Sequence, residues 1–201
     1  MAVLPPHVVI DDFLPGGLHD DLLGYVLARE DGFAPAAVRR GAVDYSDRRR
    51  AWTRPDLGDL RAPFREAIVR HLPQLFAGLG MEPFEPALIE LELSAHRNGD
   101  FFRPHVDTFV GKQGNEGETD RVVTAVYYFH AQPRGFTGGE FAIHPFGEGE
   151  PVIIEPRDNR LLAIPAFAIH EVRPIACPGD AFRSARFAVN VWLNRESKGR
   201  G

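Results

Sequence analysis

The chain has 201 residues and a formal net charge of -5; 44% of its residues are hydrophobic and 25% are charged. These values are typical of one globular domain with a substantial core, and they argue against general binding to nucleic acid. The single cysteine, Cys177, excludes an internal disulfide framework and favours a reducing compartment. No signal peptide and no membrane-spanning apolar run are evident, so we expect a cytoplasmic protein without a membrane partner.

Residues 1–84 are predicted to be mainly helical. Apolar residues recur at helical spacing over residues 18–30 and again over residues 57–79. Pro63 suits the first turn of the second helical run, whereas Pro73 predicts a break that divides this run into two helices.

Residues 31–56, between the helical runs, show no clear periodicity and are predicted to be irregular. They contain a basic cluster formed by Arg39, Arg40, Arg48, Arg49 and Arg50. A solvated loop would account for this composition. The alternative is a loop at the rim of a functional site, where the arginines meet an acidic substrate or a surface rich in backbone groups.

The second half of the chain has the alternating pattern of β-strands. The candidate strands are 88–96, 101–107, 121–130, 139–144, 151–155, 160–164, 169–173 and 184–193. This series predicts a mainly β (α+β) fold, with a double-stranded β-helix or jelly-roll core over residues 85–194 and the N-terminal helices packed on one sheet. We expect one domain over residues 1–201. The polar segment 108–120 is predicted to be a mobile loop over the site.

The end of the predicted strand 101–107 carries a His-x-Asp pair, His105 and Asp107. Side chains at positions i and i+2 of an extended strand lie on the same face. One imidazole and one carboxylate on one face are two of the three ligands of a facial triad, which holds Fe(II) and leaves other coordination positions open. His170, which follows the apolar run 161–167, is predicted to be the third ligand.

Arg186 lies in the apolar, alternating strand 184–193, on the same face as Asn190. Burial of an unpaired arginine is costly, and a bidentate carboxylate partner would remove that cost. We therefore predict that Arg186 binds a carboxylate; a position at a strand edge facing water is the alternative. The hydroxyl of Tyr128 is predicted to donate to the same carboxylate, with Tyr127 as the rival position.

The order of these motifs resembles the prolyl-hydroxylase-like branch of the 2-oxoglutarate- and Fe(II)-dependent oxygenases. The resemblance rests on His105-x-Asp107, Val123-Thr124-Ala125-Val126-Tyr127-Tyr128-Phe129, Gly138-Gly139-Glu140-Phe141, His170 and Arg186-Phe187-Ala188-Val189-Asn190-Val191-Trp192. It extends from about Glu85 to Asn194.

The resemblance implies a set of ligands and cosubstrates. Iron would be held by His105, Asp107 and His170, while Arg186 would bind the distal carboxylate of 2-oxoglutarate with help from Tyr128. Asn190 would lie near the cosubstrate or an iron-bound water. The other expected reactant is O2, with ascorbate as a possible supporting reductant.

The chain departs from the pattern of its relatives at two positions near the predicted site. His96 stands where many relatives have a tyrosine, so we expect it either to contact the cosubstrate or substrate or merely to replace that ring. A longer separation between His170 and Arg186 leaves Arg183 as a rival for binding 2-oxoglutarate.

The expected activity is that of an Fe(II)- and 2-oxoglutarate-dependent dioxygenase that releases succinate and CO2. Its substrate would be a prolyl residue of a peptide or protein, or a small amino-acid-like metabolite. Two alternatives are a non-catalytic binding module and a cupin-like metal-binding protein on the same fold. A module would predict a damaged triad, and a cupin would predict a His-x-His pair with a following glutamate; the chain has neither feature. The sequence leaves the oligomeric state open.

Overall fold

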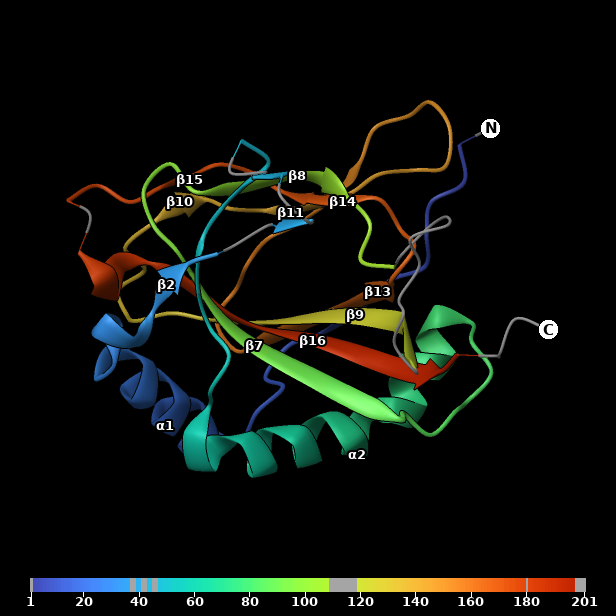
Figure 1. The fold of residues 1–201 in the computed structure, drawn as a ribbon, viewed down its shortest axis with the longest axis horizontal. Coiled ribbons are helices and arrows are strands. Elements are labelled where there is room, and N and C mark those ends of the chain that lie inside the picture. The colour runs from blue at the N-terminus through green and yellow to red at the C-terminus, as the bar shows by residue number, and fades with distance from the viewer. Residues whose placement is uncertain are drawn as a thin grey trace.

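The computed structural model describes residues 2–36, 39–40, 43–44, 47–108, 119–179 and 181–197 (Figure 1). The side chains of Arg39 and Arg40 and nearly all of the expected loop at 108–120 lie outside the described residues. No helix among the described residues is both long enough and apolar enough to cross a membrane.

Two antiparallel sheets form the body of the protein (Figure 1). The major sheet has seven strands in the order β1 (Val8–Ile10), β13 (Arg160–Pro165), β9 (Thr119–Phe129), β16 (Arg186–Glu196), β7 (Leu88–His96), β6 (Trp52–Arg54) and β2 (Ala34–Pro35). The minor sheet has five strands in the order β12 (Val152–Ile154), β11 (Phe141–Ile143), β14 (His170–Val172), β8 (Phe101–His105) and β5 (Arg49–Arg50). Two short pairs join β10 (Thr137–Gly138) to β15 (Ile175–Ala176) and β3 (Arg39–Arg40) to β4 (Val43–Asp44). The predicted mainly β fold with a double-sheet core is confirmed.

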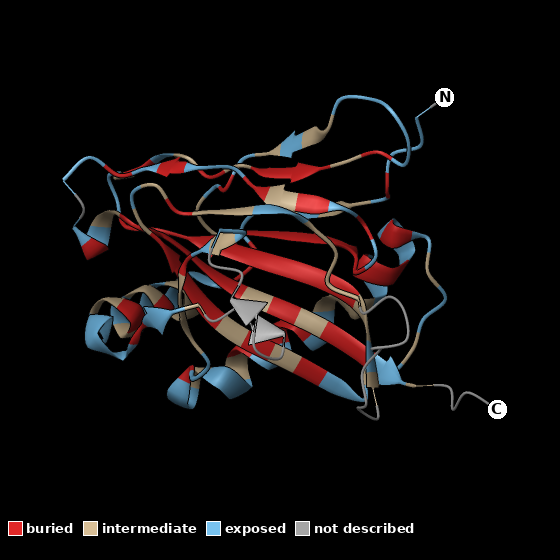
Figure 2. Ribbon diagram, turned by 45° about the horizontal axis from the view of Figure 1, so that its top comes forward, coloured by how far each residue is buried: buried red, intermediate tan, exposed pale blue. Residues whose placement is uncertain are grey.

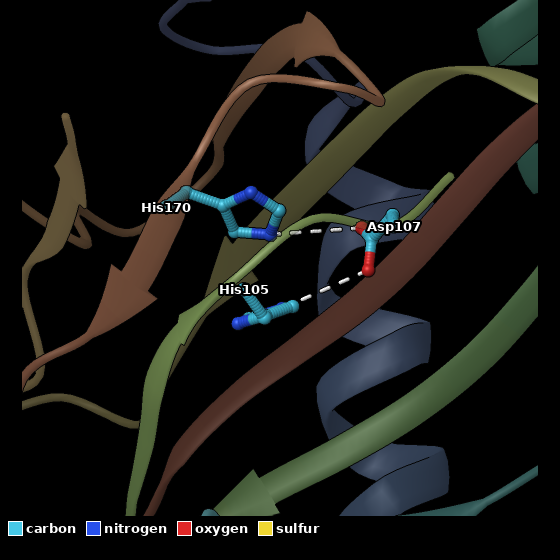
Figure 3. Close-up of side chains that lie close together, drawn as sticks. All are labelled: His105, Asp107 and His170. Carbon is cyan, nitrogen blue, oxygen red and sulfur yellow. Dashed lines mark ion pairs between the residues drawn. The ribbon is translucent and has the colours of Figure 1, made fainter. Parts of the chain in front are cut away.

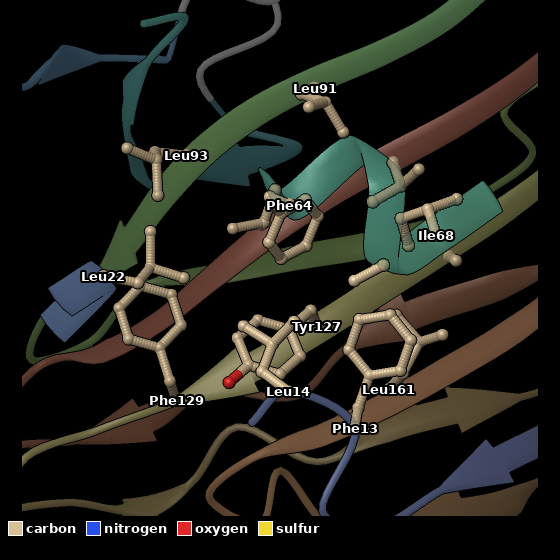
Figure 4. Packing of buried hydrophobic residues seen from close by; sticks show 14 of the residues in the cluster. Phe13, Leu14, Leu22, Phe64, Ile68, Leu91, Leu93, Tyr127, Phe129 and Leu161 are labelled. Carbon is tan, nitrogen blue, oxygen red and sulfur yellow. The ribbon is translucent and has the colours of Figure 1, made fainter. Parts of the chain in front are cut away.

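The helices lie on the outer face of the major sheet, as predicted (Figure 1). They are α1 (Gly16–Leu27) and α2 (Arg61–Leu79), with short 3-10 helices at Glu30–Gly32, Gly58–Leu60 and Phe182–Ser184. The apolar stripe of α2 packs Phe64 and Ile68 against sheet residues such as Leu93 (Figure 4). Full burial of side chains of this size contributes about 2–3 kcal/mol each. One core cluster thus joins residues from both halves of the chain; the single-domain boundaries stay a prediction.

Helix α2 is continuous, so the predicted break at Pro73 is wrong. Proline removes one backbone hydrogen bond, here the one to the carbonyl of Val69. Val69 lies on the exposed face of the helix, where water can satisfy that carbonyl. Buried Ile68 and Leu75, on either side of the proline, both belong to the core cluster and hold the helix together. The helix ends at Gly80, whose φ of 63° suits glycine.

Alternation along β16 gives the major sheet two different faces. Phe187, Val189 and Val191 point into the helix-side core, whereas Ala188 packs with residues of the minor sheet in a second cluster. Figure 2 shows that the central strands are largely buried and that exposed residues gather on the outer surfaces of the helices. The polar residues of the inner face therefore lie between the two sheets.

The segment 31–56 is not wholly irregular, so that prediction is wrong in part. Its strands β2 and β6 extend the major sheet, and β5 extends the minor sheet at β8. Residues with weak local periodicity can still form edge strands, because pairing with an existing strand satisfies their backbone groups.

Strand β8 ends at His105, two residues earlier than predicted. The backbone N–H groups of Asp107 and Thr108 both donate to the carbonyl of Ala166, at 2.9 and 3.2 Å. The chain therefore leaves the sheet immediately after His105 and turns toward the loop between β13 and β14.

Candidate metal and cosubstrate site

A cavity of about 600 Å³ lies between the two sheets. Its walls contain every residue that the sequence analysis assigned to the metal or to the cosubstrate. The lining is formed by Arg49, Pro55, Glu90, Leu91, Glu92, His96, Phe102, His105, Asp107, Arg121, Thr124, Val126, Tyr128, Phe141, His170, Val172, Arg186, Asn190 and Trp192.

His105, Asp107 and His170 all line this cavity, and their side chains point toward one another (Figure 3). Nε2 of His105 lies 3.7 Å from Oδ1 of Asp107, and Nε2 of His170 lies 3.6 Å from Oδ2. Two metal–ligand bonds of about 2.1 Å span at most about 4.2 Å, so one ion can contact each of these pairs. The convergence does not come from a shared strand face, because the chain turns after His105. It comes from the pairing of His105 with His170 across β8 and β14 and from the turn that brings Asp107 back.

Both imidazoles are held in the form that can bind a metal. Nδ1 of His105 lies 2.8 Å from the carbonyl of Arg103, and Nδ1 of His170 lies 2.9 Å from the carbonyl of Ala168. Because a carbonyl only accepts, each Nδ1 carries a proton and donates it, so that in the neutral ring Nε2 is the nitrogen with the free lone pair. Burial and the neighbouring His170 lower the pKa of His105, so its ring is neutral.

The Asp107 carboxylate is fixed by two donors from the major sheet. Oγ1 of Thr124 donates to Oδ2 at 2.7 Å, and Nε1 of Trp192 donates to the same oxygen at 2.9 Å. Burial alone would raise the pKa of Asp107, but the two histidines and these hydrogen bonds outweigh burial and keep the pKa below its usual range. The group is therefore an ionised carboxylate.

Aromatic rings hold the two imidazoles in place. The ring of Phe102 is stacked on His105 with 3.4 Å between ring centroids, and Phe141 is stacked on His170 at 4.9 Å. These contacts restrict rotation of the imidazoles and exclude water from their faces.

Arg186 is buried, with 2% of its surface exposed, and makes no salt bridge within the described part of the chain. Its Nη1 donates to the carbonyl of Gly139 at 3.1 Å, and its Nη2 donates to Nδ1 of His96 at 2.9 Å. Nε is buried and has no partner among the described residues. Burial lowers the pKa of Arg186 from its ordinary value. A cation that is buried among neutral acceptors, with a donor to spare, is suited to a carboxylate ligand.

Tyr128 lies beside Arg186, whose guanidinium carbon is 5.2 Å from the centroid of the tyrosine ring. Its buried hydroxyl makes no hydrogen bond of ordinary geometry within the described residues. Burial raises the pKa of Tyr128 to about 12, so it remains a neutral donor. The rival Tyr127 points to the opposite face of the sheet, where its hydroxyl contacts His19 at 2.8 Å and Asn159 at 3.0 Å.

Arg183 and His96, whose roles the sequence left open, lie in different surroundings. Arg183 is exposed on the 3-10 helix Phe182–Ser184 and does not line the cavity, whereas Arg186 does. His96 is buried beside Arg186, and burial together with that cation lowers its pKa well below the ordinary value. His96 is therefore a neutral acceptor. Asn190 also lines the cavity and donates to Oε1 of Glu92 at 3.3 Å.

These residues fit an iron ion and 2-oxoglutarate. Two imidazoles and one carboxylate form the donor set of a facial Fe(II) site. At a separate position in the same cavity, buried Arg186 and Tyr128 have an N–H and an O–H that make no hydrogen bond of ordinary geometry with a described residue. A single small molecule with a chelating end and a carboxylate end would satisfy both positions.

Comparison with known proteins identifies the family. Residues 91–194, just over half of the chain, match the model of the 2OG-Fe(II) oxygenase superfamily. The chain belongs to this superfamily. Membership assigns it Fe(II), 2-oxoglutarate and O2, so the expected cofactors and the predicted oxygenase class are confirmed.

A curated relative agrees with this assignment, and several solved structures share the fold. An uncharacterized PKHD-type hydroxylase of Synechocystis sp. is 35% identical over 145 residues, which cover 68% of this chain and 46% of that protein. The chain thus spans less than half the length of that relative. A prolyl-4-hydroxylase of Pseudomonas putida shares the fold with a TM-score of 0.69 and 21% identity, over 98% of this chain and 94% of the other. A Trichoplax adhaerens prolyl hydroxylase shares the fold with a TM-score of 0.68 and 20% identity, over 96% of this chain and 85% of the other.

Several residues of this oxygenase site were not recognised from the sequence. Thr124 and Trp192 lie in the predicted strands 121–130 and 184–193, but their contact with Asp107 depends on the register between strands, which pairs these two residues with each other. Phe102 was visible only as part of an apolar run. Arg49, from the basic cluster, lines the cavity beside Glu92, and nothing in its local sequence distinguishes it from its neighbours.

Proposed function

We propose that the protein is an Fe(II)- and 2-oxoglutarate-dependent hydroxylase, in which His105, Asp107 and His170 bind the iron. Arg186, with Tyr128, binds the distal carboxylate of 2-oxoglutarate. The observation that carries the proposal is the position of Arg186, a buried cation without a described anionic partner, in the same cavity as the metal-binding donor set.

The side chains of this cavity have distinct tasks in the proposed reaction. When bound, iron would activate O2, the oxidant, with two electrons from the decarboxylation of 2-oxoglutarate; one oxygen atom would enter a substrate C–H bond and the other succinate, with release of CO2. Thr124 and Trp192 hold the Asp107 carboxylate, so that its position does not change when the metal binds. Phe102 and Phe141 keep water from the imidazole faces, which protects the site from unproductive oxidation.

His96 is proposed to orient Arg186. Its Nδ1 accepts from Nη2 of the arginine, and β7 and β16 pair these two residues directly. An asparagine at position 96 would keep a short acceptor near the place of Nδ1, whereas phenylalanine would keep only the ring. His96→Asn is therefore expected to retain more 2-oxoglutarate affinity than His96→Phe, with kcat less affected than KM in both. Equal affinities in the two variants would mean that His96 only fills space.

The proposed substrate is a prolyl residue of a peptide or protein, or a small amino-acid-like metabolite. The peptide alternative is supported by the shared fold with the Trichoplax adhaerens prolyl hydroxylase, which was solved with a peptide fragment of the hypoxia-inducible factor oxygen degradation domain. The metabolite alternative is supported by the partly enclosed cavity of about 600 Å³, which is large enough for the cosubstrate and a second small molecule.

Succinate formation by the purified protein tests the activity. The protein is incubated with Fe(II), 2-oxoglutarate, ascorbate and O2, with and without a panel of prolyl peptides and free amino acids. Succinate above a metal-free control, increased by a panel member, is the expected result. His105→Ala and Asp107→Ala should abolish it, and Arg70→Ala, at an exposed position on α2 outside the cavity, should not.

An anaerobic titration separates an inactive site from a missing substrate. Addition of 2-oxoglutarate to the Fe(II) protein should produce a metal-to-ligand charge-transfer band. Failure to form this band in the wild-type protein, together with no succinate, would contradict the proposed function and favour a non-catalytic binding module.

A further inference from the structure

The segment that carries the basic cluster forms part of the cavity wall. Strand β5 pairs with β8, and Arg49 lies opposite Phe102 in this pairing. The neighbouring residue Arg48 donates from Nη2 to the carbonyl of Pro104 at 3.3 Å, and its own carbonyl accepts from the N–H of Arg103 at 2.9 Å. The segment is thus fixed along the strand that ends in His105.

Strand alternation turns one arginine of this segment inward. Arg48 and Arg50 are exposed, whereas the side chain of Arg49 lines the cavity and is only 15% exposed. Its guanidinium carbon lies 5.1 Å from the centroid of Phe102, the ring that is stacked on His105. A charged donor therefore stands one aromatic ring away from a proposed iron ligand.

The hydrogen-bonding capacity of Arg49 is only partly used. Nη2 donates to Oε1 of Glu92 at 3.1 Å, an oxygen that also accepts from Asn190 at 3.3 Å. Nε is buried and has no partner among the described residues. A buried N–H without an acceptor is costly, and such groups in native proteins commonly mark a place for water or a ligand.

The charges around Arg49 indicate what kind of acceptor would fit. The described lining contains three arginines and three carboxylates: Arg49, Arg121 and Arg186, and Glu90, Glu92 and Asp107. The charges of Fe(II) and of doubly ionised 2-oxoglutarate also cancel. A substrate with a net charge would therefore bring an uncompensated charge into a partly enclosed cavity, which is unfavourable.

A free amino acid fits this environment poorly despite its zero net charge. Its ammonium group needs an anion, and both glutamates of the lining are already paired. Arg121 donates to Glu90 through two nitrogens, at 2.9 and 2.6 Å, and Arg49 pairs with Glu92 through Oε1. An amide carbonyl needs only one donor, and Nε of Arg49 can supply it.

We propose that Arg49 determines substrate specificity by donating its Nε–H to an uncharged carbonyl oxygen of the substrate. The cavity accordingly favours a proline whose amino and carboxyl groups are both in amide bonds. This inference rests on the proposed function, since it concerns the substrate of the same cavity.

Three small probes test this proposal. They are N-acetyl-L-proline N-methylamide, which is uncharged, N-acetyl-L-proline, which has a free carboxylate, and L-proline, which is a zwitterion. Their affinities are measured on the Mn(II)- and 2-oxoglutarate-loaded protein from the paramagnetic broadening of proline-ring protons. The uncharged amide is expected to bind about tenfold or more tightly than either of the others.

Substitutions at position 49 give the decisive comparison. Arg49→Met removes the donor, and Arg49→Lys keeps the charge beside Glu92 but loses the Nε–H. Both variants should bind the amide about tenfold or more weakly, with 2-oxoglutarate affinity within about twofold of wild type. Arg70→Met, on the exposed face of α2, should bind all ligands as the wild type does.

Three results would overturn the assignment: unchanged amide affinity in both Arg49 variants, a wild-type preference for a charged probe, or no binding of any probe. A parallel loss of 2-oxoglutarate affinity would also overturn it, because Arg49 would then bind the cosubstrate. Failure of the proposed function has a different signature, since the wild-type Fe(II) protein would then give no charge-transfer band with 2-oxoglutarate.

Discussion

The support given to Asp107 by the major sheet leads to a quantitative prediction for metal binding. Trp192→Phe removes one N–H donor and keeps an aromatic ring under Arg121, whose guanidinium carbon lies 3.9 Å from the tryptophan ring. Thr124→Val removes the other donor with little change in shape. Hydrogen bonds to a charged group contribute about 1.5–3 kcal/mol, and loss of such a partner commonly weakens metal binding about 10–100-fold.

Each single substitution is therefore expected to raise the Kd for Fe(II) about 10–100-fold. The double variant should lose less Fe(II)-binding free energy than the sum of the losses in the two single variants, because both donors act on the same oxygen, Oδ2. Anaerobic titration calorimetry with Fe(II) measures these constants. Trp52→Phe and Thr137→Val change the same residue types outside the cavity and serve as matched controls. Unchanged Kd values in both single variants would refute the view that these bonds prepare Asp107 for the metal.

Three further predictions follow from particular contacts. Arg186→Lys should raise the Kd for 2-oxoglutarate about tenfold or more in the charge-transfer titration, since lysine lacks the planar donor pair, while Arg183→Lys should leave it unchanged. Leu93→Ala, in the centre of the helix-side core, should lower the free energy of unfolding by about 2–5 kcal/mol in urea titrations; a loss below about 1 kcal/mol would contradict its assignment to a tightly packed core. The His19–Asp158 pair should stabilise the fold most between about pH 4 and 6.5. The hydrogen bond to Asp158 raises the pKa of His19 above 6.5, so its contribution is complete below that value and is lost as pH rises through the folded-state pKa. Burial would raise the pKa of Asp158, but bonds from His19 and the His130 backbone lower it from 3.8 to about 2, so that contribution is lost as pH falls toward 2. His19→Phe should flatten both limbs of the stability profile in urea titrations, and an unaltered profile would contradict the pairing.

The identities of the proposed ligands were predictable from the sequence because few residue types bind iron in this pattern. His105, Asp107 and His170 are brought together as expected. The geometric reason was wrong, however, since it placed Asp107 within a strand. Local periodicity contains no information about Ala166, which lies far along the chain. Its carbonyl accepts from the N–H groups of Asp107 and Thr108 and so draws them out of the strand.

The supporting contacts could not be predicted, because they depend on the pairing of distant strands. Alternation predicted the two strands themselves, 121–130 and 184–193, which correspond to β9 and β16. Which side chains lie beside each other on these neighbouring strands depends on their register. This register pairs Thr124 with Trp192, and no local sequence pattern specifies it. The same holds for Arg49, because the pairing of β5 with β8 joins segments more than fifty residues apart.

The residues proposed to bind the metal and the cosubstrate come from a different part of the chain than Arg49, which is proposed to bind the substrate. All the proposed metal and cosubstrate residues lie within residues 91–194, which match the family model. The iron ligands come from β8, from the turn after it and from β14, whereas Tyr128, Arg186 and Asn190 stand on β9 and β16, which pair along most of their length. Arg49 lies outside the matched region, on a short edge strand whose hydrogen bonds attach it to β8. An edge strand can change in sequence without disturbing β9 and β16, so the position that faces the substrate can vary while the oxygenase chemistry is retained. Exchange of residues 47–50 between relatives should accordingly alter probe selectivity and leave 2-oxoglutarate affinity unchanged.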